Sequence, residues 1–164
     1  MAADASGGDL MVTRLGGCQC GDVRYALSAP PLTLYACHCL DCQKQSASGF
    51  GMSMPVPRSG FQILQGEPEM WRRTAASGRV VACAFCRTCG TRLYHAPDRN
   101  PSIVNVKPGT LDNPLGLIPI GHVWVSRAHP WLKPSIAGLV FEEQPDTFEP
   151  LFAAWKQRNE LPAA

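Results

Sequence analysis

The sequence carries almost no excess charge of either sign. Lysine and arginine together number 15 and aspartate and glutamate 13, so the formal net charge is only +2, and no run of basic residues occurs. Proteins that bind nucleic acid concentrate basic residues on one surface to neutralise phosphates. The composition therefore argues against a nucleic acid as partner.

Long apolar segments are also missing. No stretch approaches the roughly 20 apolar residues that a membrane-spanning helix needs. Residues 1–17 contain two aspartates and lack the apolar segment of a secretory signal. We therefore expect no membrane partner and a cytoplasmic location, where thiols stay reduced.

Strong helical patterns are scarce, and the 15 glycines and 15 prolines are spread along the chain. This pattern favours short strands joined by turns, and we predict an all-β protein. The predicted strands span residues 23–27, 32–36, 50–55, 61–64, 69–74, 79–85, 91–95, 102–106 and 122–126. A single C-terminal helix is predicted from Pro150, a residue suited to a first helical position, and from the apolar stripe of Leu151, Phe152 and Trp155.

The length of 164 residues is that of one compact domain. We predict a flexible N-terminus over residues 1–12 and a β domain over residues 13–135. Residues 136–164 form a C-terminal extension whose helix is expected to pack on that domain.

Cysteine, in contrast, is abundant. Seven of the eight cysteines fall into three short clusters, which are Cys18 and Cys20, then Cys37, Cys39 and Cys42, then Cys86 and Cys89. In a reducing compartment, thiols this close together indicate metal ligands before disulfides, and zinc is the metal that thiolates most often bind.

The first and third clusters predict one closed zinc site. Cys86 and Cys89 flank two residues and are followed by Gly90, which suits the sharp turn of a zinc knuckle. Cys18 and Cys20 are likewise bounded by glycines, Gly16-Gly17 before them and one glycine after. We therefore predict a structural zinc bound by Cys18, Cys20, Cys86 and Cys89.

The middle cluster predicts a different kind of site. On an extended segment Cys37 and Cys39 point to the same side, a turn can add Cys42, and His38 faces away and is not expected to be a ligand. Zinc with three protein ligands keeps a position for water or an incoming thiol, which is typical of catalytic sites. The alternative is a closed site with a fourth ligand from elsewhere in the chain.

Four further residues of these types have simpler interpretations. Cys83 lies on a predicted strand and is interpreted as a small buried hydrophobic residue. His122 and His129, in a tryptophan-rich segment, are interpreted as core and rim residues. His95 is expected on the surface at a strand end.

The order of these motifs resembles the glutathione-dependent formaldehyde-activating enzyme family, also known as the centromere protein V type domain. The resemblance covers about residues 13–133 and rests on Gly17-Cys18-x-Cys20-Gly21, Cys37-His38-Cys39-x-x-Cys42 and Phe85-Cys86-x-x-Cys89-Gly90-Thr91-x-Leu93. It implies a tent-like all-β fold with two zinc ions per chain, the structural one at Cys18, Cys20, Cys86 and Cys89 and the second at Cys37, Cys39 and Cys42.

The activity that the resemblance implies is the addition of glutathione to formaldehyde, a carbon–sulfur lyase reaction written backwards. A zinc-held thiolate would be the nucleophile. The alternative is a non-catalytic zinc module that binds glutathione or a macromolecule. Four cations, Lys44, Arg72, Arg73 and Arg92, are candidates to line the approach of glutathione carboxylates, although a solvated surface position is the simpler interpretation of each. The physiological thiol and aldehyde stay open, as does the choice between monomer and homodimer.

Overall fold

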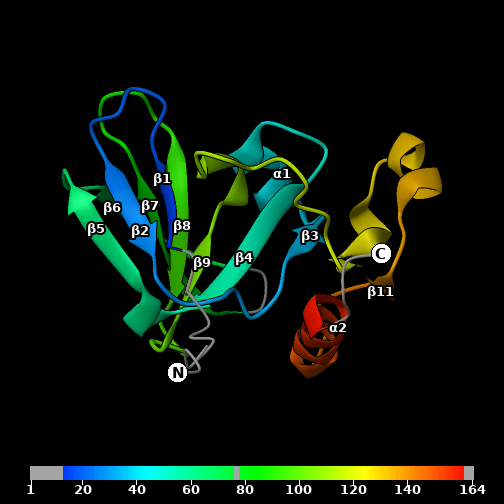
Figure 1. The fold of residues 1–164 in the computed structure, drawn as a ribbon. Helices are drawn as coiled ribbons and strands as arrows, with labels where there is room; N and C mark the ends of the chain where they lie inside the picture. Colours follow the sequence, from blue (N-terminus) through cyan, green and yellow to red (C-terminus); the bar gives the residue numbers. More distant parts are fainter. Residues whose placement is uncertain (1–12, 76–77, 161–164) are drawn as a thin grey trace, which may run out of the picture.

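The computed structural model describes residues 13–75 and 78–160, and its strands form two sheets (Figure 1). The smaller sheet is antiparallel and has the order β1-β2-β5, with β1 at Arg14–Gly17, β2 at Arg24–Leu27 and β5 at Phe61–Gln65. The larger sheet has the order β11-β10-β3-β4-β9-β8-β7-β6. Its strands are β3 (Tyr35–Cys37), β4 (Gly51–Pro57), β6 (Glu69–Thr74), β7 (Val80–Phe85), β8 (Arg92–Pro97), β9 (Ile103–Val106), β10 (Gly121–Val123) and β11 (Leu139–Phe141).

Helices are few in the described part of the chain, and the predicted all-β class is confirmed. The two α-helices are α1 (Leu40–Ser46) and α2 (Glu149–Glu160), and single 3₁₀ turns span Arg58–Gly60, Pro108–Thr110, Val125–Arg127 and Pro130–Ser135. Neither α-helix has the length and apolar character that crossing a membrane requires.

Strand β4 joins the two halves of the larger sheet. Its first residues pair with β3, where Gly51 lies opposite Cys37, and its last residues pair on the other edge with β9, where Met54 lies opposite Val106. The pairs β3–β10 and β10–β11 are parallel, and the remaining pairs are antiparallel. The segment that carries the middle cysteine cluster therefore lies at the junction of the two halves.

The main core contains residues from both sheets, among them Tyr25, Met54 and Leu93, which are fully buried. A second, smaller core lies around β3 and β10 and buries Cys37 and Val123 together with a leucine of α2. The middle cysteine cluster is thus part of an apolar core as well as a group of metal-ligand side chains.

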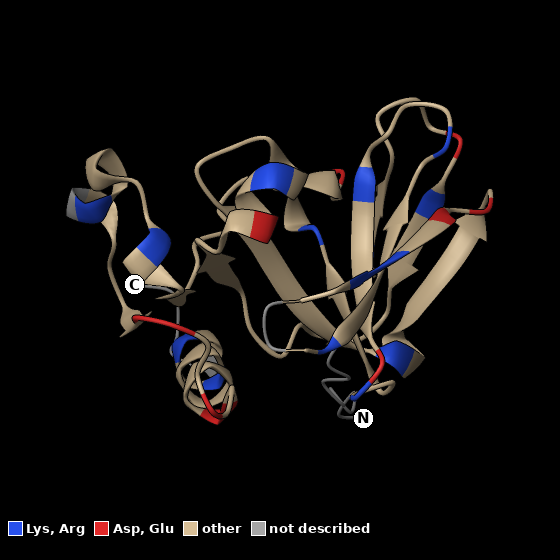
Figure 2. Cartoon of the chain, turned by 180° about the vertical axis from the view of Figure 1, so that it is seen from behind, with Lys and Arg blue, Asp and Glu red and all other residues tan. Residues whose placement is uncertain are grey.

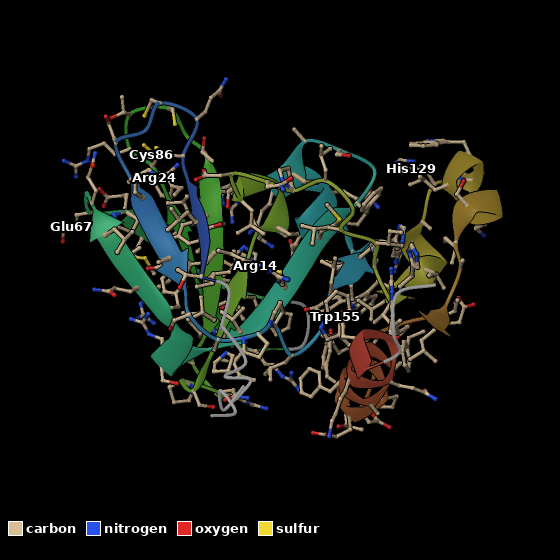
Figure 3. All side chains as sticks on the ribbon, viewed as in Figure 1. Arg14, Arg24, Glu67, Cys86, His129 and Trp155 are labelled. Carbon is tan, nitrogen blue, oxygen red and sulfur yellow. The ribbon has the colours of Figure 1, made fainter. Side chains whose placement is uncertain are left out.

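Helix α2 packs on the β domain. Leu151 is fully buried in the second core, and its carbonyl accepts a hydrogen bond of 3.1 Å from the Thr33 hydroxyl. Trp155 packs against the main core (Figure 3). The helix therefore contacts both cores, one through each of these apolar side chains.

Two strands escaped prediction, and two predicted strands differ from the observed ones by three residues at one end. Gly16 and Gly17 belong to β1 and not to a turn, because they pair with Tyr25 and Arg24 of β2. Position 16 requires glycine, because a Cβ there would lie 2.4 Å from the ring of Tyr25. The other missed strand is β11, which has only three residues. Strand β3 begins later than expected, and β10 ends at Val123 because Trp124 adopts a φ of 60°. The predicted flexible residues 1–12 lie outside the described residues.

Candidate metal centres

The first and third cysteine clusters meet at one end of the fold. Cys18 and Cys20 lie in the turn between β1 and β2, and Cys86 and Cys89 lie in the turn between β7 and β8. These turns lie side by side at the top left of Figure 1, and Figure 3 labels Cys86 there. The four Sγ atoms are all within 4.8 Å of one another, so one ion can contact all of them.

The sulfur–sulfur distances fit a tetrahedral zinc. The Sγ atoms of Cys18 and Cys20 are 3.4 Å apart, and those of Cys20 and Cys86 are 3.7 Å apart. Zinc–sulfur bonds of about 2.3 Å in a tetrahedron place the ligand atoms roughly 3.8 Å apart. The cluster also joins the smaller sheet to the larger one, since two of its cysteines come from each.

Donor groups surround these sulfurs as they do around zinc-bound thiolates. The Val23 amide donates to Cys18 Sγ at 3.2 Å, and the Thr91 hydroxyl lies 3.1 Å from Cys89 Sγ. The hydrogen bond from Thr91 is the main cause that lowers the pKa of Cys89 to about 5. Gly90 has a φ of +71°, as the tight turn requires, and its amide donates to the Cys86 carbonyl at 2.8 Å.

The middle cluster is local in sequence. Cys37 ends β3, Cys39 is the N-cap of α1, and Cys42 lies in the first turn of that helix. Their Sγ atoms also lie within 4.8 Å of one another. Among the described residues, no fourth cysteine, histidine, aspartate or glutamate joins this group. We call these three residues the thiol triad.

The helix start explains how the triad forms. The Cys42 amide donates to Cys39 Sγ at 3.4 Å, so a sulfur accepts the capping hydrogen bond that a serine or aspartate oxygen usually accepts. Hydrogen bonds from the Cys37 and Cys42 thiols, helped by this amide, lower the pKa of Cys39 to about 2. Hydrogen bonds to Cys39 and Cys42, in which Cys37 keeps its thiol proton, raise the pKa of Cys37. A thiolate is thus favoured at the helix N-terminus, where a metal cation would find its ligand already deprotonated.

The histidines near the triad have other partners. His38 is buried, and its Nε2 atom lies 3.0 Å from Nδ1 of His122. Neither residue belongs to a group of potential metal ligands in the described part of the chain. His129 is exposed and stacks on Trp131, with ring centroids 6.2 Å apart.

His95 is not a surface residue, in contrast to the prediction. Its side chain is buried, with 7% of its surface exposed, because β8 lies between β7 and β9. Burial lowers the pKa of His95 well below its usual value, and nearby cations, Lys107 first, lower it further. The neutral ring accepts a hydrogen bond of 2.9 Å from Arg92 at Nε2.

Three cations lie around the triad, and sequence reasoning named two of them. Arg73 has only 12% of its side chain exposed, pairs with Asp41 at 2.6 Å, and leaves a buried Nε donor without a partner among the described residues. Arg92 is partly buried. Lys107, which was missed, extends from the end of β9, and its Nζ lies 3.3 Å from the Ser53 hydroxyl. Burial lowers the pKa of Lys107, while the charges of Cys42 and Cys37 oppose that shift.

The other two predicted cations are surface residues. Lys44 is exposed on α1, and Arg72 is exposed and pairs with Asp98 at 3.1 Å. Cys83 is fully buried, as predicted, and accepts a long hydrogen bond of 3.6 Å from Gln45. It does not belong to either cysteine group.

A cavity of about 620 Å³ opens over the triad. All three triad cysteines line it, with Arg73 and His95 on one side and residues between Trp124 and Phe152 on the other. A second cavity, of about 420 Å³, is lined by Cys42, Arg92 and Lys107. The triad is therefore accessible to small molecules.

Comparison with known proteins decides the family. The model of the glutathione-dependent formaldehyde-activating enzyme family matches residues 13–127, which is more than half of the chain. The chain belongs to this family. All seven clustered cysteines lie within the residues that match the family model, whereas α2 lies outside them.

A solved structure has a related fold. The crystal structure of a Rhodobacter sphaeroides protein aligns with 77% of this chain and 98% of its own, with a TM-score of 0.50 and 18% sequence identity. At this identity the likeness concerns the fold alone. Formaldehyde activation and glutathione are thus associated with the present chain through its membership of the family.

Proposed function

We propose that the protein adds a glutathione-like thiol to a small aldehyde, or catalyses the reverse reaction, at a zinc ion bound by Cys37, Cys39 and Cys42. A second zinc, bound by the other four clustered cysteines, would be structural. The observation that supports the catalytic assignment best is the thiol triad on the wall of a 620 Å³ cavity, without a fourth protein ligand among the described residues. Three protein ligands and an accessible fourth position are typical of catalytic zinc.

Zinc bound at the triad would supply Lewis-acid chemistry, which lowers the pKa of a thiol that enters the remaining position. Zinc and three thiolates together carry a charge of about −1. The cations Arg73, Arg92 and Lys107 oppose this charge and favour the approach of a second anion, the substrate thiolate. Their position around the triad therefore supports the proposal.

The reaction is an addition without oxidation or reduction. The thiolate sulfur attacks the carbonyl carbon, a carbon–sulfur bond forms, and the carbonyl oxygen takes a proton from water. We assign the Arg73 guanidinium to bind that oxygen, because the Arg73 side chain lines the cavity together with the triad cysteines. The ion pair with Asp41 holds the guanidinium in place.

The proposed partners are small molecules, and the proposed compartment is the cytoplasm, where a reduced thiol is available. Positive and negative side chains are interspersed over the fold (Figure 2), which supports a small-molecule ligand over a nucleic acid.

The test measures turnover and zinc content together. Formation of the thiol adduct is followed by carbon NMR exchange with ¹³C-formaldehyde and glutathione. The adduct also forms without a catalyst, so activity is measured as the exchange rate above the uncatalysed background. We expect Cys39→Ser to hold one zinc instead of two and to react at background. Arg73→Lys should keep both zincs and lose roughly 100-fold in rate, the lower end of the scale for one donor to a developing oxyanion. Arg72→Lys, the exposed neighbour, is the matched control and should be unchanged.

Two outcomes would contradict the proposal. Full activity in Cys39→Ser would exclude the triad as the reactive centre. A wild-type protein that holds two zincs and binds glutathione, but accelerates no thiol–aldehyde reaction, would be a non-catalytic binding module instead.

A further inference from the structure

One wall of the cavity is built by a part of the chain that lies outside the family match. Residues Gln144, Thr147, Phe148 and Phe152 line the same cavity as the thiol triad, whereas the matched residues end at 127. This segment runs from the end of β11 into α2, at the lower right of Figure 1.

The wall is fixed to the domain by hydrogen bonds. The Trp124 amide donates to the Glu143 carbonyl at 3.3 Å, and its indole donates to Gln144 at 3.2 Å. The Ser126 amide donates to the Glu142 carbonyl at 3.1 Å. Trp124 holds a left-handed backbone conformation, which is uncommon for a tryptophan and places the indole beside the cavity. The wall is therefore held in place by the chain itself.

The wall presents aromatic rings. The rings of Tyr35 and Phe148 have centroids 5.1 Å apart, and those of Phe148 and Phe152 are 6.5 Å apart. All three line the cavity and are only partly buried, so each has ring surface left to contact a ligand. Such rings contribute binding free energy chiefly to other apolar or aromatic groups.

Charge is unevenly distributed along the cavity wall. The acidic residues Asp146 and Glu149 lie beside the rings, whereas Arg73, Arg79 and Arg99 line the cavity from β6 and from the turns that follow β6 and β8. Of the other charged lining residues, Asp41 is paired with Arg73, and Arg127 lies in the turn that follows Trp124. Carboxylates of a glutathione-like thiol are therefore favoured on the arginine side and disfavoured on the aromatic side. The part of the substrates that can bind on the aromatic side is therefore the substituent on the carbonyl carbon of the aldehyde. Formaldehyde carries none, so the rings on this side of the cavity would have no group of that substrate to contact.

We infer that the aldehyde used by this protein carries an apolar group about the size of an aromatic ring, which binds against Tyr35, Phe148 and Phe152. The inference rests on the proposed function, and it names the substrate class of that site. In the reaction, the thiolate attacks the carbonyl carbon and the oxygen takes a proton, so the ring becomes a substituent on the carbon next to sulfur. Phe148 and Phe152 are then specificity-determining residues and take no part in bond formation.

Two unreactive thioethers test the wall without turnover. S-benzylglutathione is the adduct of benzaldehyde without its hydroxyl group, and S-methylglutathione is the adduct of formaldehyde without its hydroxyl group. We expect the zinc-loaded protein to bind the benzyl compound at least about ten-fold more tightly by calorimetry, the usual scale for an extra apolar group in a fitted pocket. Phe148→Ala should remove most of this ratio, and Phe148→Leu should remove part of it.

Phe141→Ala is the matched control, because Phe141 packs in the same core but does not line the cavity. It should keep the wild-type ratio, which separates loss of the wall from loosening of the extension. A ratio near one in the wild-type protein, or an equal fall in both affinities in Phe148→Ala, would overturn the inference.

Turnover distinguishes this inference from the proposed function. We expect Phe148→Ala to lower the ratio of kcat/KM for benzaldehyde to kcat/KM for formaldehyde about ten-fold, and Phe141→Ala to keep the wild-type ratio. If formaldehyde is turned over but both thioethers bind equally, the substrate class is wrong and the proposed function stands. If no aldehyde reacts but the benzyl compound binds ten-fold more tightly, the proposed function fails and the ring-binding wall stands.

Discussion

Replacing Cys86 by serine should remove the closed metal centre and with it much of the stability of the fold. Cys86 is buried, with 1% of its surface exposed, and its Sγ lies 3.7 Å from that of Cys20, a residue 66 positions earlier in the chain. A zinc ion bound there acts as a cross-link between the two sheets. The substitution changes one ligand atom and almost no volume, so its effect reports on the metal.

The expected loss can be estimated from the structure. A cross-link that closes a loop of 66 residues contributes about 4 kcal/mol in the chain-entropy model of cross-linking. A serine hydroxyl left buried without a partner costs about 1–3 kcal/mol more. The sum, about 5–7 kcal/mol, is comparable with the entire free energy of unfolding of many domains, about 5–15 kcal/mol. We therefore expect a melting temperature lower by roughly 10–25 °C, or an insoluble protein.

The assay combines zinc content with thermal unfolding, and Cys39→Ser is the matched control. That variant loses a ligand from three cysteines that lie within six residues of sequence, so little long-range constraint disappears. It should retain one zinc, a near-native circular dichroism spectrum and a melting temperature close to that of the wild type. A chelator added to the wild-type protein should reproduce the effect of Cys86→Ser. A soluble Cys86→Ser protein with two zincs and an unchanged melting temperature would refute the reasoning.

Three further substitutions test other parts of the structure. Cys83→Ala should cost only about 1–2 kcal/mol in urea unfolding and keep both zincs, because Cys83 is a buried apolar side chain; zinc loss would make it a ligand. Gly66→Ala should lower the free energy of unfolding by about 2–4 kcal/mol, because the φ of Gly66 is +72° and a Cβ there would lie 2.2 Å from a carbonyl oxygen. Gly78→Ala is the control and should lower it by about 1 kcal/mol, because Gly78 has a similar φ of +73° but open space around its Cβ position. Lys107→Met should weaken zinc retention at the triad about ten-fold in chelator competition, because the lysine charge opposes the negative charge of the thiolates. Lys44→Met, at an exposed position, should retain zinc like the wild type. Equal retention in the two variants would show that the charge of Lys107 does not affect the triad.

The cysteine groups could be anticipated from the sequence because their geometry is local. A knuckle of three or four residues can place two sulfurs on one ion whatever the rest of the fold, and both knuckles contain the same backbone hydrogen bond. The Cys18 amide donates to the Val23 carbonyl, and the Cys86 amide donates to the Thr91 carbonyl, each at 2.9 Å. Cys39 at a helix start makes the triad compact for an equally local reason.

The surroundings of the triad depend on pairing between distant strands, which no local pattern fixes. His95 lies opposite Cys83 on one side and opposite Asn105 on the other, so β8 is an interior strand and its histidine is buried. Lys107 follows the strand β9, which pairs with the end of β4, and the lysine thereby comes close to Cys42. In the sequence alone, nothing distinguishes Lys107 from a lysine on the solvent-exposed surface.

The two metal centres differ in their place in the topology, and this difference fits different tasks. The four-cysteine centre joins residues of two sheets, so a change of ligand there would separate parts of the core. The triad belongs to consecutive residues at the end of β3 and the start of α1, and the structure around it is held by strand pairing and by the buried Leu151 of α2. Under the proposed function, an ion at the triad would therefore exchange a ligand for a substrate thiol without loosening the fold. The aromatic wall, fixed independently by hydrogen bonds to residues 124–126, would keep its shape during that exchange.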